Sequence, residues 1–264
     1  MNVRPRTLPP GWYPGGREQT IREIEEFRRR STQPEGTARA GIAPHAGWSF
    51  SGSIACHVFQ SLRRDVQTIV VVGGHLAPHS GLLAADLELL EELRDSLNFK
   101  EDRYADNTVE VHLPLLKYLH PEARALHLRA APSAEALQLG EQLAATAERL
   151  NRKIAVVGST DLTHYGDNYG FTPKGTGAVA VKWVKEVNDR RLIEALVALD
   201  LERALELAGS EHSACSVGGA VAAARFAERS GAEGGELLEY RTSYDLSPSP
   251  FFVGYAGIIY PRSA

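Results

Sequence analysis

The chain has 264 residues, of which 43% are hydrophobic and 23% are charged, the proportions of an ordinary globular protein that can bury a sizeable core. A formal net charge of −4 without a basic stripe argues against nucleic-acid binding. No long apolar stretch and no signal-peptide pattern is found, which argues against a membrane partner. Two cysteines, Cys56 and Cys215, do not make a disulfide framework and favour a reducing, cytoplasmic setting.

Helices and strands alternate along the first half of the sequence. Apolar residues at helical spacing predict a helix over residues 18–30. A strand ending near His45 follows it. The remaining predictions for this half are a helix over 53–62 and strands over 68–72 and 82–87.

The second half continues this alternation. Glu110 and His112 stand in a segment, 109–114, that we interpret as extended. The other predicted elements are a strand over 124–129, a helix over 134–150, a strand over 154–157, two helices over 177–207 broken near Asp200, a helix over 216–229, and closing strands over 237–244 and 253–260.

Several of the predicted strands are short, continuous apolar runs bounded by glycine. Such runs are typical of parallel strands that are buried on both faces. We therefore predict an α/β fold with one central sheet covered by helices on both faces. No repeat, low-complexity segment or linker divides the sequence, so residues 1–264 are expected to form a single domain.

Three of the predicted strands end in tight polar loops that carry a histidine. The histidines are His45, His75 and His164, and Asp161 lies three residues before the last of them. The carboxyl ends of parallel strands meet at one edge of a sheet, where ligands bind. Three imidazoles and a carboxylate at that edge favour a metal site or an acid–base site.

His45 and His75 are the first candidate metal ligands, because imidazole is a common ligand of zinc, copper and iron. A third ligand is needed, and Cys215 is the candidate, since it stands at the predicted start of a helix that would favour its thiolate form. The alternative for Cys215 is a small buried hydrophobic side chain, the role we assign to Cys56. For each histidine, the alternative is a hydrogen bond to a loop carbonyl.

Asp161 and His164 form a carboxylate–imidazole pair just beyond a strand. The pair could bind a metal, or His164 could act as a general base with Asp161 fixing its tautomer. The preceding Ser159 and Thr160 are not part of the Gly-x-Ser-x-Gly motif that a serine hydrolase of the α/β class would require.

The motifs in this order resemble those of the Memo family, which in bacteria is often named protein B of the AmmeMemoRadiSam system. Similarity runs along nearly the whole sequence. Its landmarks are Gly-Trp-Tyr at 11–13, Ala-Pro-His-Ala-Gly at 43–47, Val-Gly-Gly-His at 72–75, Glu-Val-His-Leu-Pro at 110–114, Asp-Leu-Thr-His-Tyr-Gly at 161–166, the helix after Cys215, and Tyr-Ala-Gly at 255–257.

The resemblance implies a fold shared with the catalytic subunits of class III extradiol ring-cleavage dioxygenases, in which two histidines and a glutamate hold Fe(II). In Memo proteins a cysteine replaces the carboxylate. Fe(II) is therefore the expected metal, with copper or zinc as competitors, because a thiolate is a softer ligand. The resemblance makes His45, His75 and Cys215 the metal ligands, places Asp161 and His164 beside the metal as catalytic residues, and adds Trp12 to the substrate pocket, to which we also assign Glu110 and His112.

Some positions depart from the family pattern. Leu76 follows the second histidine where relatives often carry a polar residue nearby, and Trp48 and Phe50 follow the first motif where a tyrosine is frequent. A pocket with fewer hydroxyls would bind a less anionic ligand.

Three functions therefore remain open: a redox metalloenzyme, an iron-, copper- or peptide-binding protein, and a zinc hydrolase. The expected occupant of the cleft is a small molecule or a peptide. The family name further implies a functional link to a radical SAM protein.

Overall fold

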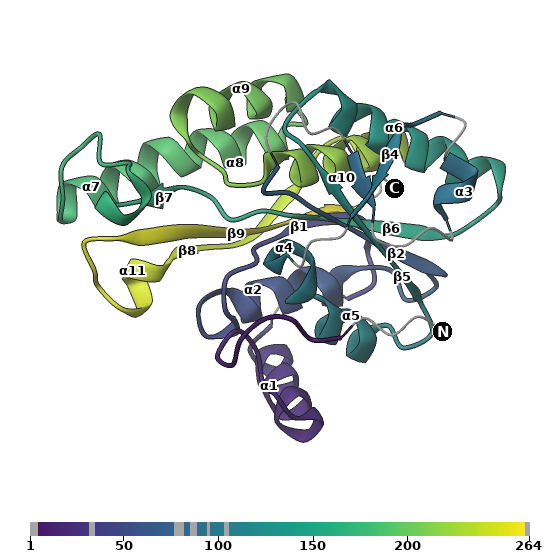
Figure 1. Cartoon of the computed structure of the whole chain (residues 1–264), viewed down its shortest axis with the longest axis horizontal. Coiled ribbons are helices and arrows are strands. Elements are labelled where there is room, and N and C mark those ends of the chain that lie inside the picture. Colours follow the sequence, from purple (N-terminus) through teal and green to yellow (C-terminus); the bar gives the residue numbers. More distant parts are fainter. Residues whose placement is uncertain are drawn as a thin grey trace.

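The computed structural model of the protein describes residues 5–31, 35–76, 82–84, 89–93, 96–102 and 106–261. Within these residues the strands form one mixed sheet (Figure 1). They are β1 (Ala38–Ala43), β2 (Thr68–Gly73), β3 (Leu82–Ala84), β4 (Phe99–Glu101), β5 (Arg124–Ala130), β6 (Ile154–Ser159), β7 (His164–Tyr165), β8 (Glu236–Thr242) and β9 (Phe252–Pro261).

The sheet order is β4-β3-β5-β2-β6-β1-β9-β7, with β8 paired to β9. Its centre, β5-β2-β6-β1, is parallel, as the apolar runs predicted. Antiparallel pairs flank it, β3 with β5 on one side and β9 with β1 on the other, so the sheet is mixed rather than parallel throughout. The last three residues of the strand predicted over 82–87 lie outside the described residues.

Helices cover both faces of the sheet (Figure 1). One layer contains α1 (Arg17–Arg30), α2 (Trp48–Ser61), α4 (Asn107–Glu110) and α5 (Leu113–Leu119). The other contains α6 (Ala134–Arg149), α8 (Asp189–Val197), α9 (Leu201–Glu211) and α10 (Val217–Arg229). The shorter elements are α3 (Leu90–Leu93), η2 (Asp167–Tyr169), α7 (Ala178–Trp183), the π-helical turn η3 (Val184–Asn188) and α11 (Ser243–Leu246). The predicted single-domain α/β fold is confirmed.

Strand β2 illustrates why the central strands are apolar on both sides. Ile69 and Val71 belong to the core shared with α1, α2 and α5, whereas Val70 and Val72 belong to the core shared with α6, α8, α9 and α10. All four side chains are fully buried. Because successive residues of a strand point to opposite faces, a sheet covered on both sides requires an unbroken apolar run.

The first turn of helix α10 lies directly against the backbone of the sheet. A Cβ atom on Gly219 would lie 2.2 Å from the carbonyl oxygen of Val72, and one on Gly218 would lie 2.4 Å from that of Ala130. Gly158 of β6 meets the helix in the same way, 2.4 Å from the Gly219 carbonyl oxygen. Glycine is therefore required on both sides of this contact, which fixes the start of α10 directly over the ends of the strands.

Two predicted elements need correction. Residues 109–114 are not extended: Asp106 caps α4, its side chain accepting a hydrogen bond from the Thr108 amide at 2.8 Å, and Pro114 occupies the first turn of α5. Helix α2 begins at Trp48, five residues before the predicted start, directly after the loop that carries His45. Among the described residues, none of the helices combines the length and apolar composition needed to cross a bilayer.

Candidate metal centre

Three neighbouring strands deliver polar residues to the same edge of the sheet. His45 follows the end of β1 by two residues, His75 follows β2 by two, and Asp161 follows β6 by two. Because β2, β6 and β1 are adjacent and parallel, these three positions lie side by side. Cys215 approaches from the other direction, in the loop just before α10.

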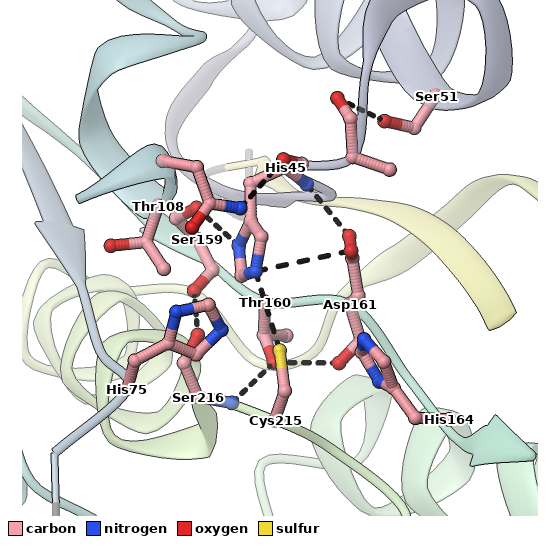
Figure 2. A network of polar contacts seen from close by, with 12 residues as sticks. His45, Ser51, His75, Thr108, Ser159, Thr160, Asp161, His164, Cys215 and Ser216 are labelled. Atoms are coloured by element: carbon pink, nitrogen blue, oxygen red, sulfur yellow. Dashed lines mark hydrogen bonds and ion pairs between the residues drawn. The ribbon is translucent and has the colours of Figure 1, made fainter. Parts of the chain in front are cut away.

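His45, His75 and Cys215 come together at this edge (Figure 2). Their ligand atoms lie within 4.8 Å of one another, and His45 Nε2 is 3.3 Å from Cys215 Sγ. The two imidazole rings stand at 89° with centroids 5.0 Å apart. Around a tetrahedral ion with bonds of about 2.0–2.3 Å, ligand atoms are separated by about 3.3–3.7 Å, so the donor set fits a transition-metal ion.

The surroundings of Cys215 favour the thiolate. Burial alone would raise the pKa of this thiol, but the charge and hydrogen bond of His45, together with a hydrogen bond from His75, outweigh burial and lower the pKa to about 6. The thiolate is the form that binds metals and attacks electrophiles. The cluster therefore places a thiolate against two histidine rings.

His75 is held in an unusual backbone conformation, with a φ of 57°. Its Nδ1 lies 3.6 Å from Oδ2 of Asp106, which in turn accepts a hydrogen bond from the buried guanidinium of Arg129 at 3.1 Å. Burial acts against the charged imidazole, but Asp106 and Cys215 together raise the pKa of His75. Asp106 thus supports the ring from the side away from Cys215, an arrangement typical of metal-binding histidines.

Asp161 joins the loops of the site to one another. Its Oδ1 accepts a hydrogen bond from the His45 amide at 2.7 Å, and its backbone carbonyl accepts one from the Cys215 amide at 3.2 Å. Its Oδ2 lies 3.9 Å from His45 Nε2. Burial raises the pKa of the carboxyl to about 6, although His164 and the His45 amide act in the opposite direction.

His164 lies beside Asp161 in Figure 2, but the hydrogen bond that orients its ring comes from elsewhere. Its Nδ1 donates to the carbonyl oxygen of Leu162 at 3.1 Å, and the ring packs edge-on against Tyr169 at a centroid distance of 5.0 Å. The expectation that Asp161 fixes the His164 tautomer is therefore corrected. Leu162 fixes it, and leaves Nε2 without a proton in the neutral ring.

A cavity of about 410 Å³ opens onto the cluster. Its walls are largely aromatic and small residues, and no lysine or arginine is among them within the described chain. The lining residues are Pro10, Gly11, Trp12, His45, Ala46, Gly47, Ser49, Phe50, His75, Asn107, Asp161, His164, Tyr169, Val253 and Tyr255. Trp12, which the sequence analysis assigned to a substrate pocket, is among these lining residues.

Glu110 and His112 do not line this cavity. The carboxylate of Glu110 anchors the N-terminal segment, accepting hydrogen bonds from the Leu8 amide at 2.9 Å and from the Tyr13 hydroxyl at 3.0 Å. His112 is completely buried, with its Nε2 3.0 Å from the hydroxyl oxygen of Ser159. The sequence analysis assigned both residues to the substrate pocket and expected their segment to be extended, whereas the segment is a pair of short helices.

Two residues of the site were missed. Asp106 carried one signal, the Asp-Asn-Thr sequence that is typical of a helix N-terminus, but nothing linked it to His75. Ser159 was considered only as a hydrolase nucleophile. In the structure its hydroxyl oxygen lies 2.9 Å from His45 Nδ1. Each contact joins residues from elements that are distant in sequence, which no local pattern reveals.

The fold and the cluster define an α/β protein with a histidine–cysteine site at the carboxyl edge of its parallel strands. Comparison with known families matches residues 4–259 to the model described as Memo-like protein. The chain belongs to this family. It is 31% identical to a MEMO1 family protein of Pyrococcus abyssi, over 95% of this chain and 97% of the relative. A MEMO1 family protein of Thermococcus onnurineus is 29% identical over 98% of this chain and 100% of the relative.

A solved structure, that of the uncharacterized protein JW3007 from Escherichia coli K12, superposes with a TM-score of 0.52. It covers 83% of this chain and 98% of its own, at 12% identity. At that identity the similarity concerns the fold alone.

Proposed function

We propose that this Memo-family protein is a non-haem iron redox enzyme of the dioxygenase type, acting on a small organic molecule. The observation that supports it is the cluster of His45, His75 and Cys215, whose two imidazoles line one cavity together with His164. A purely structural site would not need His164 beside the ligands, nor an opening to solvent.

In this proposal His45, His75 and Cys215 hold the ion through Nε2 or Nδ1 and Sγ. Fe(II), when bound, supplies a redox-active centre with positions left for oxygen and substrate. Asp161 keeps the His45 loop and the Cys215 loop together through its two hydrogen bonds.

His164 is the proposed general base. Its Nδ1 proton is committed to the Leu162 carbonyl, so the Nε2 lone pair is available to take a proton from the substrate. The edge-on contact with Tyr169 holds the ring in place. His164 is not part of the three-residue ligand cluster, which suits an acid–base group better than a ligand.

The cavity suggests an uncharged substrate. Trp12, Phe50, Tyr169 and Tyr255 supply flat apolar surface, and the described lining holds neither lysine nor arginine to pair with a carboxylate or phosphate. An apolar peptide side chain would suit the same walls.

A second candidate function is suggested by the thiolate itself. Sulfur is a soft ligand that favours copper(I) or zinc over Fe(II), and a three-ligand site open on one side suits zinc hydrolysis or metal binding without catalysis. Asp161, with its raised pKa, would then be a neighbouring proton carrier.

The test is metal analysis of untagged protein purified anaerobically without chelators, followed by oxygen uptake with a panel of uncharged organic compounds. We expect iron in the wild type, its loss in His45→Ala, and its retention in His164→Ala with uptake reduced by about 10²–10⁴-fold. Zinc without oxygen uptake would favour the second candidate. Loss of iron in His164→Ala would make His164 a ligand and overturn its role as a base.

A further inference from the structure

A buried chain of hydrogen-bonding groups leads away from the metal cluster into the core. His45 Nδ1 lies 2.9 Å from the hydroxyl oxygen of Ser159, and the same oxygen lies 3.0 Å from Nε2 of His112. Figure 2 shows the first of these contacts. The three side chains are at most 1% exposed, so water does not compete for these bonds.

The Ser159 hydroxyl has one proton and lies between two ring nitrogens. If it donates to His112 Nε2, it is free to accept the Nδ1 proton of His45. His45 then carries no proton on Nε2, the atom 3.3 Å from Cys215 Sγ, and can offer that lone pair to a metal ion. If the hydroxyl instead donates to His45, the proton of His45 sits on Nε2 and blocks the ligand position.

A buried histidine at position 112 lowers the stability of the core. Its Nδ1 has no hydrogen-bond partner among the described residues, and its ring packs against Phe59 at a centroid distance of 5.5 Å. Leaving a buried polar atom unpaired costs about 1–3 kcal/mol. An apolar residue would avoid this cost, so stability alone does not account for a histidine here.

His112 is also suited to accept the serine proton. Burial, with a smaller contribution from His45, lowers the pKa of His112 to about 3, so the ring is neutral at physiological pH. A neutral imidazole has one nitrogen that accepts and one that donates. With the proton on the unpaired Nδ1, Nε2 accepts from Ser159.

We propose that Ser159 and His112 are positioning residues that hold the proton of His45 on Nδ1 and thereby present its Nε2 to the metal ion. The inference deepens the proposed metal centre and rests on it. His112 is thus moved from the substrate pocket to the support of a ligand. Partners of this kind typically contribute 10–100-fold to metal affinity.

The experiment compares zinc affinity, measured by competition with a chromophoric chelator, with thermal stability. His112→Phe preserves the ring volume and removes the unpaired nitrogen, so we expect equal or higher stability with zinc affinity reduced about 10–100-fold. Ser159→Ala should lose a similar factor. The double variant should lose little more than either single variant, because both act through one chain.

Two further variants separate positioning from packing. His112→Gln places an amide oxygen near the position of Nε2 and should restore part of the affinity. His120→Phe is the matched control: His120 is a buried histidine whose Nε2 bonds the Phe59 carbonyl at 2.8 Å, outside the cluster. It should lose stability and keep its zinc affinity. Equal zinc affinities in wild type and His112→Phe would overturn the proposal.

A second readout needs no metal. In ¹⁵N-histidine NMR spectra of the metal-free Cys215→Ala variant, which lacks the thiolate that would draw a proton to Nε2, His45 should be the Nδ1-protonated tautomer. Adding Ser159→Ala or His112→Phe to this variant should remove that preference. An Nε2-protonated His45 in Cys215→Ala would contradict the inference. If the wild type takes up no metal, the proposed function fails, and the tautomer still decides whether Ser159 and His112 control His45.

Discussion

The two cysteines of this chain occupy opposite kinds of surroundings. Cys56 lies in the middle of α2, fully buried in the apolar core, and burial raises the pKa of its thiol to about 12. Cys215 lies in a loop against two imidazoles, and the pKa of its thiol falls to about 6 despite the burial around it. Burial alone makes a thiol inert, whereas burial beside positively polarised partners favours the thiolate, the form that can bind a metal.

The largest expected difference between the two cysteines is in metal binding. Cys215→Ser should weaken zinc binding by on the order of 10²–10³-fold, because a bound ion worth about 10–16 kcal/mol is shared among about four ligands. Cys56→Ser should leave the affinity unchanged and lower the melting temperature instead, since it places a hydroxyl in an apolar core. Chelator competition and thermal unfolding of the two variants measure both effects. Equal zinc affinities in Cys215→Ser and the wild type would exclude Cys215 as a ligand.

A smaller difference is expected in alkylation of the metal-free protein. At pH 7 a thiol of pKa about 6 is mostly thiolate, whereas one of pKa about 12 is thiolate in about one molecule in 10⁵. The lower intrinsic nucleophilicity of the weaker base offsets part of this ratio, which leaves a rate difference on the order of 10²–10³-fold. Peptide mass spectrometry after a timed iodoacetamide reaction checks it. Faster modification of Cys56 in the folded protein would show that the imidazoles do not activate Cys215.

The effect of burial on a pKa, seen in Cys56, is also seen in the carboxyl group of Asp189. Asp189 is completely buried, and burial raises its pKa to about 7, against hydrogen bonds from Thr163 and Tyr240. Since the folded state holds this proton more tightly than the unfolded state, the stabilisation is complete below about pH 4 and is lost as the pH rises to 7. The loss is on the order of a few kcal/mol, at about 1.4 kcal/mol per pKa unit.

Denaturant unfolding of the wild type and of Asp189→Asn between pH 4 and 8 tests whether stability falls with rising pH as expected. Asparagine keeps an oxygen for Thr163 but cannot ionise, so the free energy of unfolding should fall less steeply with pH in the variant. Parallel pH profiles would mean that Asp189 does not titrate in this range.

Sequence analysis predicted best those parts of the molecule whose apolar residues follow a regular local pattern. The runs in β2 and β6 are apolar because both faces of the sheet are covered, and their loops brought His75 and Asp161 to one edge. The segment of α4 and α5 was mistaken for a strand because its helices are short and depend on the Asp106 cap rather than on a repeat.

The support of the ligands was not predictable from sequence. Ser159 and His112 are 47 residues apart in the chain and meet only after β6 and α5 have packed. Likewise, the Leu162 carbonyl takes the role expected of Asp161, because the loop turns its backbone toward the His164 ring. A motif indicates which side chains reach an edge, but not which backbone atom will orient them.

The glycine contact between α10 and the sheet has a mechanical consequence. At Gly158 and Gly219 the backbone of the helix lies directly on the backbone of the strands, with no side chain between them at this point. The spacing between the Cys215 loop and the histidine loops is therefore set by the hard radii of main-chain atoms. Substitutions on the outer faces of α6 or α9 will be accommodated by rearrangement of neighbouring side chains. The positions of His45, His75 and Cys215 will keep their separation even when the surrounding core repacks.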